Sequence, residues 1–146
     1  MKEARVLFAG VTLVLRAGWL DITDDLPEGA PPTLARLDGI GALQLSVARY
    51  RSGAEPNIAE QDLRGLLHEF FDRHHLGKPT DVRMSLGGNI IISGDFSREY
   101  ESGRVWLVSD GRDVALVTYT AQEPQDARIR AEISESDGIV ASLGFL

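Results

Sequence analysis

Hydrophobic and polar side chains alternate along several short stretches of the chain, which is the spacing of β-strands. The clearest example is Ala42–Tyr50, where Leu43, Leu45 and Val47 alternate with small or polar residues. A period of two places these three side chains on one face of a sheet, and it predicts a strand with one buried side.

Weaker patterns of the same kind precede this strand. Arg5–Leu15 is interrupted by Gly10, and it predicts either two short strands, Arg5–Ala9 and Val11–Leu15, or one bent strand. Thr33–Asp38 is a further short candidate. A polar segment rich in proline separates the two regions and is expected to be a surface loop.

Two β-hairpins are predicted in the second half of the chain. Asp81–Leu86 and Asn89–Phe96 flank Gly87–Gly88, a pair that fits a tight turn. Arg104–Ala121 contains two apolar runs joined by a turn at Ser109–Asp113. Consecutive hairpins predict a sheet that is mainly antiparallel.

A long helix is predicted at Asn57–His75. Its apolar side chains fall on one stripe at helical spacing, and the stripe contains Leu63, Leu66, Leu67, Phe70 and His74. Asn57 can cap the first turn, with Glu60 three residues later as in a capping box. Gly77 suits the C-terminal end of this helix.

A second helix is predicted near the C-terminus. Apolar residues recur there at roughly helical intervals, at Ile129, Ile133, Val140 and Leu143. Its start has two candidates, because a helix can begin at Glu123–Pro124 or at Ser134–Asp137. Gly138 weakens the longer version.

The order of these elements predicts the fold class. Strands, a helix, two hairpins and a final helix give one α+β domain over residues 1–146. We expect a twisted, mainly antiparallel sheet with both helices packed on it, as an α/β sandwich. A chain of 146 residues is long enough to bury a core as one domain.

The acidic composition narrows the classes of partner. The formal net charge is −7, and no run of Lys or Arg is present. Nucleic acids bind mainly through cations on phosphates, so we expect no nucleic-acid partner. The charge keeps the protein soluble, and it is also suited to a basic protein partner.

Two absences bear on the compartment. There is no cysteine, so neither a disulfide nor a thiolate metal site can form. No stretch reaches the ~18 apolar residues of a membrane span. Arg16 interrupts any apolar core of a signal peptide. These features predict a cytoplasmic protein without a membrane span.

One group of side chains could bind a metal. His68, Asp72 and His75 are spaced i, i+4 and i+7, and on a helix they fall within a sector of about 60°. Such a set can hold zinc with an open position. The sector lies away from the apolar stripe, however, where a metal would have no shielding or supporting hydrogen bonds. The sequence therefore predicts no cofactor, and a small hydrolase or metal-dependent enzyme using these residues stays the alternative.

Two acidic segments are candidates for contact with a partner. Asp21, Asp24, Asp25 and Glu28 lie in one loop, and this loop lacks the glycine and the bidentate glutamate of an EF-hand. The second candidate is the turn that contains Asp110 and Asp113. A solvated loop is the simplest interpretation of the first segment, and both segments would suit a basic partner.

No motif predicts catalysis. The serines lack a G-x-S-x-G setting, and Gly39 and Gly41 lack the third glycine of a phosphate loop. We therefore expect that the protein is not an enzyme and has no catalytic residue.

Trp106 and Tyr119 allow two interpretations. Trp106 and Val108 share one face of their strand, and Val105 and Leu107 share the other. Because both faces are apolar, the strand should be covered on both sides, and the aromatic residues should belong to the core. If one face of the sheet is open, Trp106 and Tyr119 would form an aromatic binding surface.

Three segments carry a resemblance to a known family, namely Leu13–Trp19, Ala42–Ser46 and Ile139–Phe145. In these segments and in the order of its elements, the chain resembles the PsbP/DcrB-like domains, a group that includes the Ran-binding Mog protein. The resemblance covers nearly the whole chain and rests on core positions, so it transfers no functional residue. It implies a binding or assembly role, as in Ran binding, photosystem assembly, chaperoning of secreted bacterial toxins or immunity-type neutralisation.

These inferences together predict a non-catalytic, bacterial protein-binding module, either an immunity-type protein or a secretion chaperone. An immunity-type protein would bind a basic toxin through its acidic loops, with salt-sensitive association. A chaperone would bind a helix of its client on an exposed apolar face of the sheet. The acidic residues are candidates for the first mode, and Trp106 with Tyr119 for the second.

Overall fold

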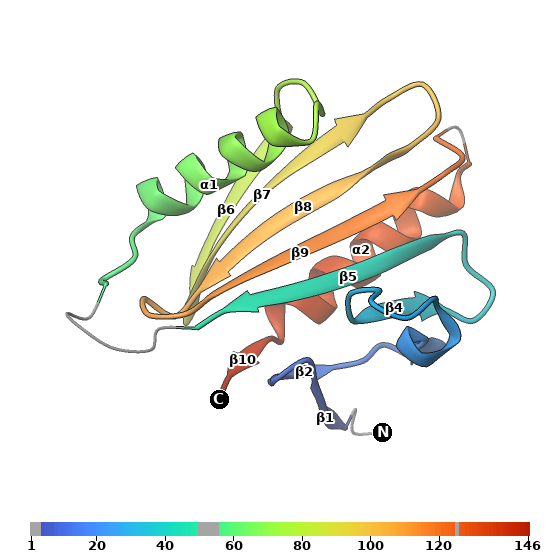
Figure 1. The fold of residues 1–146 in the computed structure, drawn as a ribbon, viewed down its shortest axis with the longest axis horizontal. Helices are drawn as coiled ribbons and strands as arrows, with labels where there is room; N and C mark the ends of the chain where they lie inside the picture. Colours follow the sequence, from blue (N-terminus) through green and yellow to red (C-terminus); the bar gives the residue numbers. More distant parts are fainter. Residues whose placement is uncertain (1–3, 50–55, 125) are drawn as a thin grey trace.

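The computed structural model describes residues 4–49, 56–124 and 126–146. These residues form a seven-stranded antiparallel sheet with the strand order β3-β4-β5-β9-β8-β7-β6 (Figure 1). Its strands in chain order are β3 (Trp19–Asp21), β4 (Thr33–Arg36), β5 (Gly41–Ala48), β6 (Thr80–Gly87), β7 (Asn89–Ser97), β8 (Ser102–Ser109) and β9 (Val114–Ala121). The predicted α+β class with a mainly antiparallel sheet is confirmed.

A small second sheet joins the two ends of the described chain. β1 (Arg5–Phe8) and β2 (Val11–Val14) form a hairpin, and β10 (Gly144–Phe145) pairs with β2. Of the two interpretations of Arg5–Leu15, the two-strand version is therefore the one observed.

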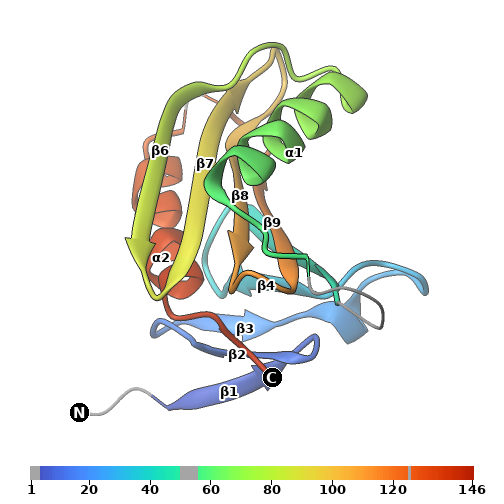
Figure 2. The same ribbon diagram turned by 90° about the vertical axis from the view of Figure 1, so that its left-hand side faces the viewer.

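Two α-helices pack on opposite faces of the large sheet. α1 (Glu60–Arg73) lies on one face and α2 (Arg128–Ala141) on the other (Figure 2). A short 3₁₀ helix, η1 (Thr23–Asp25), lies in the connection between β3 and β4. Neither of the α-helices in the described ranges is long and apolar enough to cross a membrane.

The predicted ends of both helices need correction. α1 begins at Glu60, because the N–H of Ala59 donates a 2.8 Å hydrogen bond to Asp62 and Asn57 lies outside the helix with a φ of 45°. α2 begins at Arg128, whose N–H donates 2.8 Å to Asp126. The predicted start of α1 at Asn57 was therefore too early, and of the two predicted starts of α2, Glu123–Pro124 was too early and Ser134–Asp137 too late.

The alternation along the central strands divides the core into two layers. The layer under α2 contains Trp106, Val108 and Tyr119. The layer under α1 contains Val105 and Leu107, with Leu63, Leu67, Phe71 and Ile92. β8 is thus covered on both sides, as its two apolar faces predicted.

A groove beside helix α1 as the candidate functional site

α1 covers only part of its face of the sheet. It packs on β7 and β8, and no described helix lies over β9 and β5 on this side (Figure 1). The alternation of the strands directs Ser46 and Leu116, which are opposite each other in the register, to this same face. An open strip of sheet therefore runs alongside the helix.

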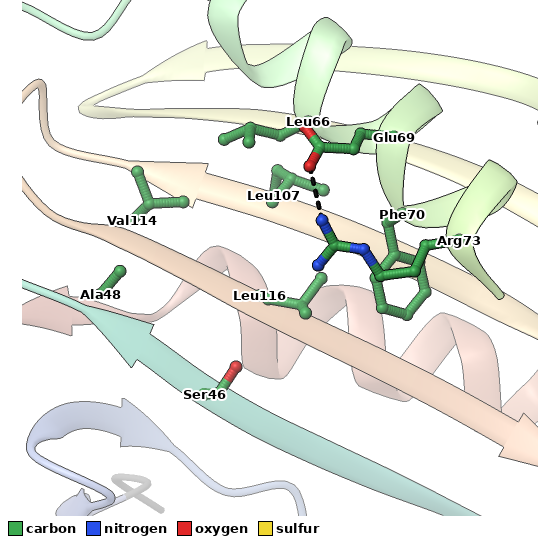
Figure 3. Close-up of a pocket in the computed structure, with 9 residues that line it drawn as sticks. All are labelled: Ser46, Ala48, Leu66, Glu69, Phe70, Arg73, Leu107, Val114 and Leu116. Carbon is green, nitrogen blue, oxygen red and sulfur yellow. Dashed lines mark hydrogen bonds and ion pairs between the residues drawn. The ribbon is translucent and has the colours of Figure 1, made fainter.

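Two adjoining cavities occupy this strip, each with a volume of about 310 Å³. The first is lined by Ser46, Ala48, Leu66, Glu69, Phe70, Arg73, Leu107, Val114 and Leu116 (Figure 3). The second is lined by Pro31, Gln44, Leu45, Ser46, Phe70, His74, Leu116 and Thr118. The two cavities share Ser46, Phe70 and Leu116, and together they are called the α1 groove below.

The floor of the α1 groove consists of apolar side chains along β9 and of small side chains along β5. Val114 and Leu116 are only partly covered, and the buried Leu107 lies beside Leu116 on the neighbouring strand β8. Ser46 and Ala48 are exposed. Small side chains on β5 let another chain approach the strand closely, while Leu116 offers it apolar surface.

The helical wall of the groove carries exposed apolar surface and a paired charge. Leu66 is 39% exposed, although it belongs to the apolar stripe of α1. On the same wall Arg73 donates a 2.7 Å hydrogen bond to Glu69 (Figure 3). An apolar surface with a polar rim is typical of a site that binds a partner.

The opposite side of the groove is bounded by the connection between β3 and β4. This segment, residues 22–32, lies on the same side of the sheet as α1 (Figure 2), and its Pro31 lines the groove. The segment contains Asp24, Asp25 and Glu28, all of which are exposed.

On the other face, Arg104 is buried in an ion network that ties the sheet to α2. It donates to both carboxylate oxygens of Asp95, at 2.5 and 3.1 Å, and to Asp137 at 2.7 Å. The second oxygen of Asp137 accepts a 2.9 Å hydrogen bond from Trp106. The hydrogen bond to Asp95 is the largest cause of a raised pKa for Arg104. Because each group is already paired, the network is suited to holding α2 on the sheet and not to transferring a proton.

Tyr119 has a similar partner in α2. Its hydroxyl donates a 2.8 Å hydrogen bond to Glu132, which also accepts from the backbone N–H groups of Ile40 and Gly41. Burial, and then this hydrogen bond, raise the pKa of Tyr119 above its ordinary value.

The predicted aromatic binding surface is wrong. Trp106 and Tyr119 are 1% and 0% exposed, because α2 covers their face of the sheet. Their polar atoms are also occupied by carboxylates of that helix. The core interpretation of both residues is the one observed, and the open part of the sheet is on the α1 side instead.

The three candidate metal ligands do not come together. His68 and Asp72 are exposed on α1, but the helix ends at Arg73 and His75 follows it with a φ of 55°. The i+7 spacing therefore does not apply to His75. Among the described residues, no group of three His, Cys, Asp or Glu side chains is placed to hold a metal ion.

The acidic candidates differ in their availability. Asp21, Asp24, Asp25 and Glu28 are all exposed, but they do not lie in one loop as predicted, because Asp21 ends β3 and Asp24 and Asp25 belong to η1. Asp21 also accepts two hydrogen bonds from Thr23. The turn between β8 and β9 is different, and its two acidic residues are Asp110 and Asp113. Asp110 accepts two backbone N–H groups, and Asp113 is 8% exposed and 3.7 Å from Arg49. The carboxylate of Asp110 therefore holds the turn together, and that of Asp113 faces Arg49 beyond the end of β5.

The sequence reasoning missed the α1 groove. One signal was present in Leu66, which shares the apolar stripe of α1 but lies at its edge. A second was the row of small and polar residues at alternate positions of β5. Neither signal predicts a groove by itself, because the groove depends on where α1 crosses the sheet.

Comparison with known proteins supports the fold. No protein-family model matches the chain, and no curated protein matches it. The solved structures it resembles include a protein from Bacteroides thetaiotaomicron VPI-5482, with a TM-score of 0.59 and 12% identity. That alignment covers 100% of this chain and 49% of the other, so the chain spans about half the length of that protein.

The second similar structure is the cyanobacterial PsbP protein, CyanoP, from Synechocystis sp. PCC 6803. The TM-score is 0.56 at 12% identity, over 94% of this chain and 88% of that protein. The chain therefore has a PsbP-like α+β fold. At this level of identity the likeness concerns the fold alone.

Proposed function

We propose that this chain is a non-catalytic protein-binding module and that its binding surface is the α1 groove. The observation that carries the proposal is the open apolar strip between α1 and β5, with Leu66, Phe70 and Leu116 along it. A groove of this kind, floored by a sheet and walled by a helix, is suited to an amphipathic segment of another protein.

The chemistry of the groove supports binding more than catalysis. Its two fully charged side chains, Glu69 and Arg73, are paired with each other. Ser46 and His74 both line the second cavity, but no hydrogen bond joins them in the described part of the chain. An activated serine needs a base within hydrogen-bond reach, so these observations give a hydrolase little support.

Of the two protein-binding roles, the groove favours that of a secretion chaperone in a bacterial cytoplasm. A chaperone of this type holds an apolar segment of its client, and the groove offers a surface of that character. An immunity-type protein would bind through its acidic segments alone. Of the two candidate segments, the turn at Asp110 is occupied by its own hydrogen bonds, and only Asp24, Asp25 and Glu28 remain available.

Co-purification from the native host tests the proposal. Ser46 lies at the centre of the groove and is exposed, so a Ser46→Tyr substitution fills the groove without removing a core side chain. Ser97→Tyr is the matched control, because Ser97 is also an exposed serine on a strand of the same sheet and does not line the groove. Partners would be identified by mass spectrometry.

We expect one protein to be recovered in stoichiometric amount with the unmodified chain and with Ser97→Tyr, and to be lost with Ser46→Tyr. Recovery of the same partner with all three proteins would place its binding surface elsewhere. A protein recovered alone under gentle conditions, with turnover in a broad substrate screen, would contradict the binding role itself.

A further inference from the structure

The charges around the α1 groove are one-sided. The segment that bounds it opposite the helix, residues 22–32, carries Asp24, Asp25 and Glu28 and contains no Lys, Arg or His. These three carboxylates have no hydrogen bond or ion pair to another side chain in the described ranges, whereas Arg73 on the helical wall is already paired with Glu69. The segment that contributes Pro31 to the groove therefore carries uncompensated negative charge.

From this arrangement we infer that the α1 groove binds a cationic amphipathic helix of another protein. The inference rests on the proposed function and adds the chemistry of the partner. An apolar stripe of the helix would lie on Leu66, Phe70 and Leu116, and its Lys or Arg side chains would face residues 22–32. Clustered negative potential favours encounter with a positive partner and sets its orientation.

The groove is better suited to a helix of the partner than to a flat apolar surface of the partner. The residues of α1 that line the groove run from Leu66 to Arg73, which is about 11 Å at 1.5 Å per residue. A partner helix would lie along this wall over about two turns, with anchors at i, i+3, i+4 and i+7. The small residues Ser46 and Ala48 provide room for the partner where β5 meets the groove.

A pair of synthetic probes tests the inference. Both would be amphipathic peptides of about 18 residues, or five helical turns, with an identical leucine stripe. One would carry Lys on its polar face and the other Glu. Binding to the full chain would be measured by isothermal titration calorimetry at low and at moderate salt.

Two triple variants separate local from overall charge. The first, Asp24→Asn with Asp25→Asn and Glu28→Gln, neutralises the three carboxylates of residues 22–32, which are called the acidic wall below. The second, Asp38→Asn with Glu99→Gln and Glu123→Gln, removes the same number of charges from exposed residues that lie outside segment 22–32 and do not line the groove. Far-UV circular dichroism would verify that both variants are folded.

We expect the Lys peptide to bind at least about tenfold more tightly than the Glu peptide, and its affinity to fall with salt. Neutralising the acidic wall should weaken binding of the Lys peptide about tenfold, which is about 1.4 kcal/mol over the three carboxylates together. The control triple variant should change it less than about twofold, and Ser46→Tyr should abolish binding of both peptides.

The failures of the two proposals give different results. Equal binding of both peptides, still abolished by Ser46→Tyr, would overturn the cationic partner while leaving the groove as the binding surface. Equal weakening by the two triple variants would show overall charge attraction only, and it would also overturn the inference. If neither peptide binds, or if Ser46→Tyr has no effect on either, the groove itself is refuted as the site.

Discussion

Tyr119 and Glu132 join the sheet to α2 through a 2.8 Å hydrogen bond between a phenol and a carboxylate that are both buried. The same carboxylate accepts the N–H groups of Ile40 and Gly41, so one side chain holds β9, α2 and the start of β5. Removing it leaves three donors without a partner, namely the buried hydroxyl of Tyr119 and the half-buried N–H groups of Ile40 and Gly41.

We predict that Glu132→Ala lowers the free energy of unfolding by about 3 kcal/mol, since an unpaired buried donor costs about 1–3 kcal/mol and the two half-buried N–H groups add a smaller amount. Tyr119→Phe should cost only about 1–2 kcal/mol, because Glu132 keeps its two backbone donors. Urea unfolding monitored by circular dichroism measures both values. A cost for Glu132→Ala no larger than that of Tyr119→Phe would contradict the shared role of Glu132.

Two glycines should respond to alanine in opposite directions. A Cβ at Gly41 would overlap the ring of Tyr119, which is buried and held by Glu132. Gly41→Ala should therefore destabilise the protein by about 2 kcal/mol or more. Gly65 lies within α1 with nothing close to its added Cβ, and Gly65→Ala should stabilise by about 0.5–1 kcal/mol. Thermal melts of the two variants give this comparison, and a shift of the same sign in both would refute it.

The geometry of Arg104 should matter as much as its charge. Arg104→Lys keeps a cation but cannot donate to both oxygens of Asp95 and to Asp137 at once, and we expect a loss of about 1–2 kcal/mol. Arg104→Ala should cost about 3 kcal/mol, because it also leaves two carboxylates close together without a cation. The check is the midpoint of urea unfolding. If Arg104→Lys has the same midpoint of urea unfolding as the unmodified protein, the bidentate contact contributes nothing to stability.

The repeat of hydrophobic positions was sufficient to predict most of the fold. β8 illustrates the reason: Trp106 and Val105 point to opposite faces and are both apolar, and both are buried at 1% and 0% exposure. The pattern reports that each face is covered. It does not report that the cover is α1 on one side and α2 on the other.

The candidate site could not be predicted in the same way. Leu63, Leu66 and Leu67 share one helical stripe, yet Leu63 and Leu67 are at most 1% exposed while Leu66 is 39% exposed. The stripe is wider than the contact between α1 and the sheet. Where that contact ends is set by packing of distant side chains, and this information is absent from the local pattern.

Stability should also depend on the ionisation of Glu135. Burial by itself would raise the pKa of this carboxyl, but hydrogen bonds from Trp19 and Arg36 outweigh it, and the pKa lies below its ordinary value of 4.5. The stabilisation is therefore complete above pH 4.5, and it is lost as the pH falls through the lower pKa of the folded state.

Glu135→Gln removes this dependence, because glutamine can accept from Trp19 but does not titrate. The variant should be less stable than the unmodified protein at about pH 7, and the difference should shrink as the pH falls towards about 3. Urea unfolding across this range measures the effect. A difference that is constant with pH would show that the charge of Glu135 does not contribute.

The central claim is that the α1 groove binds a partner, and NMR titration locates the contact most directly. ¹⁵N-labelled protein would be titrated with the Lys peptide while amide shifts are recorded. We predict that the largest changes fall in residues 44–48, 66–74 and 114–118, which line the groove, with small changes in α2. Changes concentrated in α2 and β6, or an unchanged spectrum at saturating peptide, would contradict the claim.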